Sequence, residues 1–400
     1  MNIDPHLCIS CRGTKYLCGL NYCPVILKNL SFKVREMGTE VSGSSPPSIF
    51  VGRFGYPKIT VYPSTPPEFG DTSSYENPRR WLEMDTTSFL AMRLNMIRGG
   101  LEFRVTEASS PGRNLFDVQV ISLSPRPVEM ELDLVNVPRG KILSETVPPL
   151  GPSAPLRSMK LGTLPPPERV VEKVFQDRDM KAVEAMERLR SNGVPVERIS
   201  KLLSVGNLGR DRRLVPTRWS ITAVDKTLSD KLVSKVKEFP HLGEIEVYVR
   251  KFNLNTFVGI LVPGNWSFEW GEAWFPSTTW NMWGAYPQVE IDYEGYFGRK
   301  TYPEIGGCYY SSRLAVAEFL EARGRQAIPI LWREIYPGFY FPVGVWFVRE
   351  NVRELFKGKP EKFPELDDAL KYVDQVLKVK SSTWIKHSKV IPMIRSRLFP

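Results

Sequence analysis

Histidine is scarce in this 400-residue chain, which holds only His6, His241 and His387. A catalytic site built from several imidazoles, such as a histidine-rich zinc hydrolase, is nearly excluded because the ligands do not exist. No apolar run approaches the roughly 18 residues that a membrane-spanning helix requires, and no basic and apolar secretory leader opens the chain. We therefore expect a cytoplasmic protein without a membrane partner.

Internal repeats and coiled-coil heptads are also absent, which excludes solenoids and long coiled coils. Hydrophobic residues make up 42% and charged residues 24%, an ordinary globular composition that excludes wholesale disorder. The formal net charge of +10 is modest for this length but favours a polyanionic partner. Helical and strand patterns alternate irregularly, so the fold class we predict is α+β, with mixed sheets and packed helices behind a small zinc knuckle.

Cysteine is rare outside one short segment. Four of the five cysteines, Cys8, Cys11, Cys18 and Cys23, lie near the amino end, and Cys308 stands alone. A C-x2-C pair followed by a C-x4-C pair can close tetrahedrally on Zn²⁺, which is structural when all four positions are protein ligands. An iron–sulfur cluster could use the same ligands. We predict structural zinc, which would replace the missing hydrophobic core of so short a segment.

Composition shifts along the chain suggest five segments. They are a C4-type zinc finger with its lead-in (1–40), a β-rich domain (41–165), a helical segment with a basic run (166–243), an aromatic-rich α+β domain (244–379) and a basic tail (380–400). A stretch rich in Gly, Ser and Pro (42–48) marks the first boundary. A proline-rich connector (147–167) disfavours helix and strand alike.

Alternation of apolar and polar residues predicts strands at 49–51, 59–62, 101–105, 116–123, 128–134, 244–252, 256–262, 289–293 and 343–348. Helical spacing predicts helices at 87–97, 168–190, 195–204, 311–323, 349–357 and 366–379. The two helices around the Asn192-Gly193 turn could form a DNA-reading helix-turn-helix, although a plain αα-hairpin is the commoner outcome. The tryptophan-rich stretch 266–283 fits a core better than a base-stacking platform.

A basic run forms the candidate nucleic-acid site: Arg210, Arg212, Arg213, Arg218 and Trp219. Guanidinium groups suit phosphate oxygens, and an indole can stack on a base. Arginines also cover surfaces or pair with carboxylates, so the alternative of a structural role stays open. A similar but weaker run is Arg53-Phe-Gly-Tyr56-Pro-Lys58.

Three carboxylates alternate at Glu290, Asp292 and Glu294. Period two puts them on one face of a strand, opposite Val289, Ile291 and Tyr293. Such a set could hold Mg²⁺ for phosphodiester hydrolysis, and these are the catalytic candidates. A solvated strand face is the commoner explanation.

Gly306 and Gly307 precede a predicted helix that carries Arg313. Free N–H groups at a helix start attract phosphate, which makes these three residues phosphate-binding candidates; the glycines could also simply make a turn. After Asp374 the chain has no acidic residue, and its end is either a docked last helix or a short partner-binding peptide.

Several blocks together resemble the Nre family of archaeal DNA-repair proteins. They are the cysteine segment with LCG at 17–19 and CP at 23–24, SPPSIFVGRFGYP at 45–57, PPLGPSAPL at 148–156, RLVPTRWSITAVD at 213–225 and GGCYYSSRLA at 306–315. The resemblance implies a part in DNA-damage repair, an N-terminal four-cysteine zinc finger with Cys8, Cys11, Cys18 and Cys23 as ligands, and archaeal cytoplasm. It implies no established reaction.

Some members of that family end in a sliding-clamp-binding peptide, Gln-x-x-hydrophobic-x-x-aromatic. Here Met393 replaces the glutamine and Ser396 the hydrophobic anchor, and only Phe399 fits. The clamp is thus a candidate partner with a degenerate peptide.

The leading hypothesis is a zinc-finger DNA-repair protein that binds nucleic acid or a repair complex. The first alternative is a Mg-dependent enzyme acting on a phosphodiester or nucleotide. The second is a non-enzymatic scaffold that recruits partners through its tail.

Overall fold

The computed structural model describes residues 5–13, 15, 17–20, 23, 25, 38–340 and 342–396. Helices pack on two mixed sheets, so the chain has the α+β class predicted from its sequence. Contacts divide it into two compact units, each with its own six-stranded sheet. We call residues 1–31 and 229–400 the outer unit, and residues 32–228 the inner unit.

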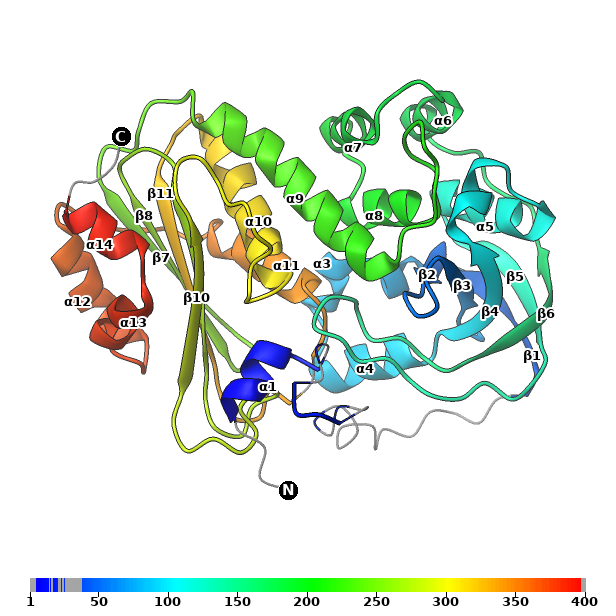
Figure 1. The fold of residues 1–400 in the computed structure, drawn as a ribbon, viewed down its shortest axis with the longest axis horizontal. Helices are drawn as coiled ribbons and strands as arrows, with labels where there is room; N and C mark the ends of the chain where they lie inside the picture. Colours follow the sequence, from blue (N-terminus) through cyan, green and yellow to red (C-terminus); the bar gives the residue numbers. More distant parts are fainter. Residues whose placement is uncertain are drawn as a thin grey trace. The chain divides into compact units, whose positions relative to one another are not determined.

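The sheet of the inner unit has the strand order β1-β5-β6-β4-β3-β2 (Figure 1). Only the β4–β6 pair is parallel; the other neighbours are antiparallel. The strands are β1 (Glu40–Ser45), β2 (Ser48–Val51), β3 (Lys58–Thr65), β4 (Ile97–Arg104), β5 (Val128–Leu134) and β6 (Ser153–Leu161). One face of this sheet supplies alternate apolar residues such as Ile59, Val61 and Leu132 to a continuous core.

The helices of the inner unit lie between and after these strands. They are α3 (Pro78–Trp81), α4 (Thr86–Leu94), α5 (Arg113–Leu123), α6 (Arg169–Gln176), α7 (Ala182–Ser191) and α8 (Val196–Ser204), with 3-10 turns η1 (Ser73–Glu76) and η2 (Val105–Ser109). Helices α5 and α8 pack on β2 and close the core. Helix α9 (Thr217–Val236) starts in the inner unit and ends in the outer one.

The outer unit contains the second sheet, with the strand order β10-β9-β11-β8-β7-β12. Its strands are β7 (Ile245–Phe252), β8 (Asn255–Val262), β9 (Phe268–Trp274), β10 (Gln288–Glu294), β11 (Ile328–Ile335) and β12 (Glu361–Phe363). Strands β8, β9 and β11 are buried along their whole length, which is expected where both faces of a sheet are covered.

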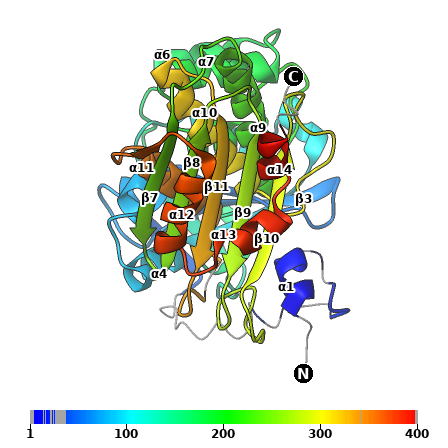
Figure 2. The ribbon, with the colours of Figure 1, turned by 90° about the vertical axis from the view of Figure 1, so that its left-hand side faces the viewer.

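Helices cover both faces of this sheet, as Figures 1 and 2 show: α12 (Leu366–Val376), α13 (Ser381–His387) and α14 (Val390–Arg395) lie on one side. Helices α10 (Cys308–Arg323) and α11 (Trp346–Leu355) lie on the other. The short helix α1 (Pro5–Cys11) packs beside β10. In the tryptophan-rich stretch 266–283, Trp266, Trp270, Trp274 and Trp280 are 0–3% exposed and belong to the core, as the sequence favoured, whereas Trp283 is 39% exposed.

Two predicted strands are helical. Residues 116–123 lie in α5, which buries Leu115, Val118, Gln119 and Ser122 at helical spacing. Residues 343–348 run into α11, whose first turn buries Trp346, Phe347 and Val348. Both stretches are short and apolar on more than one side, and such runs fit a strand template as well as a buried helix.

Several elements lie where the sequence indicated none, among them β1, β12, α1 and α3. Strand β6 crosses the proline-rich connector, where Pro155 still accepts a hydrogen bond from Val135 through its carbonyl oxygen. Strands β9 and β11 and most of helix α9 were also not expected. The five-segment division of the sequence stays a prediction beside the two compact units.

No helix in the described ranges is both long and apolar enough to cross a bilayer.

Candidate nucleic-acid interface

The tip of the β2–β3 hairpin holds its side chains outward. Gly55 has a φ of +81°, and a Cβ atom there would lie 2.6 Å from the carbonyl oxygen of Lys58, so glycine is required. The amide of Lys58 donates to the Gly55 carbonyl oxygen (2.9 Å), which closes the turn. In this turn Phe54 is 75% exposed and Tyr56 51% exposed.

The first turn of α9 meets this tip, although the two segments are far apart in the sequence. The amide of Val51 donates to Oγ1 of Thr217, 166 positions later, at 2.8 Å. The rings of Tyr56 and Trp219 then lie 5.4 Å apart between centroids, tilted by 55°. Trp219 is 45% exposed. The weaker basic run of the sequence and the end of the stronger one therefore form one surface of the inner unit.

We call this the aromatic–basic surface and define it by Arg53, Phe54, Tyr56, Lys58, Arg218 and Trp219. The Arg53 guanidinium lies over the Phe54 ring, 5.2 Å from its centroid. Lys58 pairs with Glu102 in a solvent-exposed salt bridge, and Arg218 lies 3.8 Å from Glu145. The Lys58–Glu102 pair is exposed and therefore weak, so a phosphate can compete for this lysine. Arg218 is 23% exposed beside the buried Glu145.

Arg212, in the middle of the basic run, is buried. Arg212 is 2% exposed; its guanidinium donates to the carbonyl oxygen of Phe175 and lies 5.1 Å from the centre of the Phe175 ring. Burial lowers the pKa of Arg212 to about 10. Arg212 thus fastens its segment to α6 and is not available to phosphate at the surface, contrary to the expectation from the sequence. Arg210 and Arg213 are exposed, and Arg210 donates to the carbonyl oxygen of Asp179.

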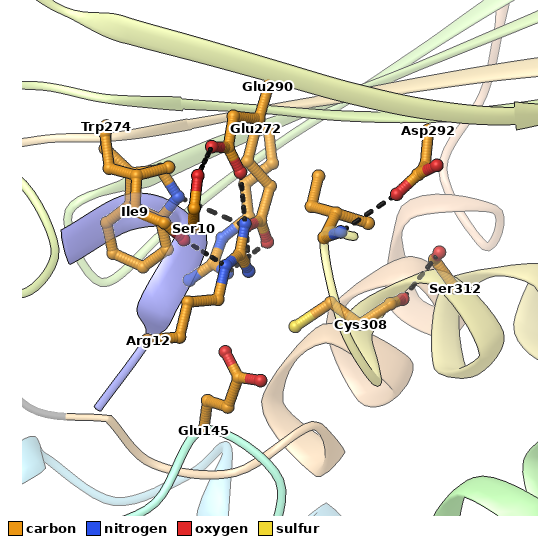
Figure 3. Close-up of polar contacts among 12 residues, drawn as sticks. Ile9, Ser10, Arg12, Glu145, Glu272, Trp274, Glu290, Asp292, Cys308 and Ser312 are labelled. Atoms are coloured by element: carbon orange, nitrogen blue, oxygen red, sulfur yellow. Dashed lines mark hydrogen bonds and ion pairs between the residues drawn. The ribbon is translucent and has the colours of Figure 1, made fainter. Parts of the chain in front are cut away.

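Val289 and Ile291 of β10 pack against the core of the outer unit, but burial does not alternate along the strand, because Tyr293 is 37% exposed and Glu294 is buried. The three carboxylates nevertheless have separate partners. Glu290 accepts from Ser10 Oγ (3.1 Å) and lies 3.5 Å from Nη2 of Arg12 (Figure 3). Burial raises the pKa of the Glu290 carboxyl, and the Arg12 guanidinium partly offsets that effect.

Asp292 and Glu294 are held by other cations. Asp292 accepts from Arg299 Nη1 (2.8 Å) and from the amide of Ile305 (2.9 Å). Glu294, 3% exposed, accepts from Trp266 Nε1 (2.8 Å) and Arg313 Nε (2.9 Å). Within the described residues no three His, Cys, Asp or Glu side chains gather closely enough to share a metal ion. The positions of these carboxylates therefore do not support the alternative of a shared Mg²⁺ site.

The Gly306-Gly307 turn is buried together with the start of α10, where Cys308 is 6% and Tyr309 0% exposed. Arg313 is also buried, and its guanidinium is shared between Glu294, Ser229 Oγ (2.7 Å) and Asp230 (2.7 Å). Arg313 thus serves an internal ion-pair network, and its donors are turned to protein rather than to a phosphate.

The four clustered cysteines carry the right donor chemistry for zinc, since thiolates are its preferred structural ligands. Cys8 and Cys11 lie on α1, and Cys18 and Cys23 are half-buried beyond it. The structure does not gather three of them at metal-binding distance among the residues it describes. The zinc finger stays a prediction that rests on the donor set and its spacing.

Arg12 is a buried residue that sequence reasoning missed. It is 2% exposed and donates to Oε2 of Glu272 (2.8 Å), while Arg333 donates to the other oxygen (3.1 Å). Burial would raise the pKa of Glu272, but these two guanidinium groups hold it below its usual value. A signal existed, because Glu269 and Glu272 are charges in a tryptophan-rich apolar segment and buried charges need partners.

The tail is a docked terminal helix as far as the structure describes it. Val390 and Ile391 of α14 are 0% exposed within the core of the outer unit. Buried Glu269 accepts from Ser388 Oγ (2.7 Å) and from the amide of Val390 (3.2 Å). Met393 and Ser396 fall in and after α14, and Phe399 lies outside the described residues.

Two protein-family models match most of the chain. Residues 17–281 match the family model described as the N-terminal part of archaeal Nre, and residues 294–399 match the C-terminal part. The chain is 45% identical to the "DNA repair protein NreB" of Archaeoglobus fulgidus, over 98% of each chain. It is 33% identical to two proteins called "DNA repair protein NreA", from Archaeoglobus fulgidus over 94% of this chain and 95% of the relative, and from Haloferax volcanii over 92% and 90%. No solved structure matches the chain.

Proposed function

This chain belongs to the archaeal Nre family, and from that membership we propose that it acts in DNA repair by binding nucleic acid. The names of its relatives support the repair role. The aromatic–basic surface supports the binding role, and we propose it as the place where nucleic acid binds.

One observation carries the location: Tyr56 and Trp219 meet at 5.4 Å, and each keeps about half of its surface in solvent. Folded proteins normally bury large aromatic side chains, so an exposed cluster marks an interaction site. Here the rings stand beside Arg53, Lys58 and Arg218. Cations together with exposed rings match the phosphates and bases of a polynucleotide.

The test is a binding measurement at low salt with a fluorescently labelled DNA, observed by anisotropy. We expect binding by the natural protein and a loss of at least tenfold in the double variant Arg53→Ala, Arg218→Ala, because two phosphate contacts disappear. Arg395→Ala is the matched control, since this arginine forms an exposed salt bridge with Asp367 in the outer unit. An unchanged affinity in the double variant would remove the surface from the proposal.

We also propose that Cys8, Cys11, Cys18 and Cys23 bind structural zinc. A closed four-thiolate site would order the amino-terminal segment and leave no open coordination position for catalysis. The Mg-dependent alternative has less support, because Glu290, Asp292 and Glu294 are each paired with a different arginine. A scaffold acting through the tail would have to use the exposed residues of α14, since Val390 and Ile391 are buried.

A further inference from the structure

We infer that the aromatic–basic surface recognises single-stranded DNA through unpaired bases, in preference to duplex DNA. This inference rests on the proposed function, because it specifies which DNA that surface takes. The preference for unpaired bases follows from the groups that this surface exposes to solvent.

Most of the exposed area of this surface that a base could contact belongs to aromatic rings. Phe54, Tyr56 and Trp219 are 75%, 51% and 45% exposed, and all three belong to two short segments joined by the Val51–Thr217 hydrogen bond. In a duplex the bases stack on one another, so their faces are hidden from protein rings. In a single strand each base can leave its neighbours and stack on an aromatic side chain, which stabilises the complex by about 1–3 kcal/mol per base.

The rings are also placed so that a face stays open. Tyr56 and Trp219 are tilted by 55°, which prevents either ring from covering the other completely. Phe54 carries the Arg53 guanidinium over its ring and is still 75% exposed, which leaves ring surface for a base. A guanidinium stacked on a ring can still donate hydrogen bonds in its own plane to a phosphate.

The platform is held in position before any ligand binds. Trp219 lies in the first turn of α9, where its amide donates to the Pro216 carbonyl oxygen (2.8 Å). At the other segment the Pro57 carbonyl oxygen accepts from the amide of Val105 (3.0 Å), which ties the residue after Tyr56 to the sheet. Side chains on such a fixed backbone lose little entropy when a base stacks on them.

The experiment compares three 20-nucleotide ligands by fluorescence anisotropy at low salt: a thymidine strand, the duplex it forms with its complement, and an abasic strand of the same length. We expect the thymidine strand to bind at least tenfold more tightly than the other two. Trp219→Leu, Tyr56→Leu and Phe54→Leu should each weaken thymidine-strand binding several-fold and leave duplex binding nearly unchanged.

Phe69→Leu and Phe297→Leu are the matched controls, because both rings are exposed, 68% and 91%, but neither is part of the surface. Thermal melting of every variant checks that the fold is kept. Equal binding of strand, duplex and abasic strand, with loss only in Arg53→Ala and Arg218→Ala, would overturn the inference and leave the proposed function standing. No binding of any DNA would overturn the proposed function itself.

Discussion

The guanidinium of Arg12 and the carboxylate of Glu272 form a buried ion pair across 260 positions of sequence, with 2.8 Å between Nη1 and Oε2. Their side chains are 2% and 0% exposed. Trp274 lies beside both the Arg12 and Arg333 guanidinium groups, at 5.9 and 5.6 Å from its ring centre. In Figure 3 Arg12 projects from α1 toward the glutamates of the sheet. The pair therefore fixes the cysteine-bearing helix to the outer unit.

Removal of Arg12 should destabilise the outer unit. Arg12→Ala removes one of the two arginines that Glu272 accepts from and the arginine beside Glu290, and breaking a buried pair typically costs about 3–5 kcal/mol. Urea unfolding followed by tryptophan fluorescence measures the change. Lys371→Ala is the control, because its salt bridge with Asp368 is exposed and should matter little. If both variants unfold at the same urea concentration, α1 is not held by this pair.

Acid should weaken the inner unit through Glu76. Burial alone would raise the pKa of this carboxyl, but Lys201 and Arg93, with a hydrogen bond from Ser48, lower it to about 2. A depressed carboxyl pKa stabilises the fold fully above the unfolded value of about 4.5, and this contribution is lost as pH falls toward 2. Its size at pH 7 is at most about 3 kcal/mol.

Glu76→Gln tests this linkage. The variant should be less stable than the natural protein at pH 7, and the difference in free energy of unfolding should shrink between pH 4.5 and 2. Unfolding curves at several pH values give that difference directly. A gap of constant size down to pH 2 would contradict the assignment.

Zinc removal should make the amino-terminal segment less ordered and easier to cleave. Purified protein is expected to contain about one zinc ion per chain, and Cys8→Ser with Cys11→Ser should abolish it, because two thiolates no longer hold a structural ion. Elemental analysis measures the metal, and proteolysis before residue 40 measures order in the segment. Cys308→Ser is the control, since Cys308 lies outside the cysteine segment. Metal-free natural protein would refute the zinc finger.

Salt dependence should separate the two kinds of contact on the aromatic–basic surface. Each phosphate contact contributes about −0.7 to the slope of log affinity against log salt for a single strand. Arg53→Ala and Arg218→Ala should therefore each reduce the slope by about that amount. Trp219→Leu should lower the affinity and leave the slope unchanged, because stacking releases no counterions. A changed slope in Trp219→Leu would speak against stacking.

Two deletions at the carboxyl end should differ in their effect on stability. Deleting 390–400 should cost about 4 kcal/mol more than deleting 397–400, because only the longer deletion exposes the site of Val390 and Ile391 and removes an amide from Glu269. Thermal unfolding measures both. A pull-down with the sliding clamp, run on the shorter deletion, then tests the degenerate peptide without disturbing the core. An equal loss of stability in both would contradict the docking of α14.

Local patterns in the sequence identified much of the fold. Period-two alternation located β5, β7, β8 and β10, and helical spacing located α4, α10 and α12. Helix α5 and the first three residues of α11 were taken as strands, because an element that is apolar on several sides has no clear period, whereas the rest of α11 falls in the predicted helix 349–357. Strand β6 was missed because its prolines argue against a strand, although Pro155 still accepts a hydrogen bond through its carbonyl oxygen.

Local sequence patterns predicted only part of the candidate site. Arg218 and Trp219 were in the predicted basic run, but Arg212 of the same run is buried against Phe175. Arg53 and Tyr56 stood in a run that the sequence ranked as weaker. Their common surface depends on a hydrogen bond between Val51 and Thr217, and no local sequence pattern predicts a contact between such distant residues.

By itself the amino-acid sequence determined the α+β class, the four clustered metal-type donors and the family resemblance, because periodicity, spacing and motifs are local properties of a chain. Only the tertiary structure decided that Tyr56 meets Trp219, that Arg12 reaches Glu272, and that each β10 carboxylate has its own arginine. Those contacts join distant segments or depend on which face of an element is covered, and the path of the folded chain alone sets both.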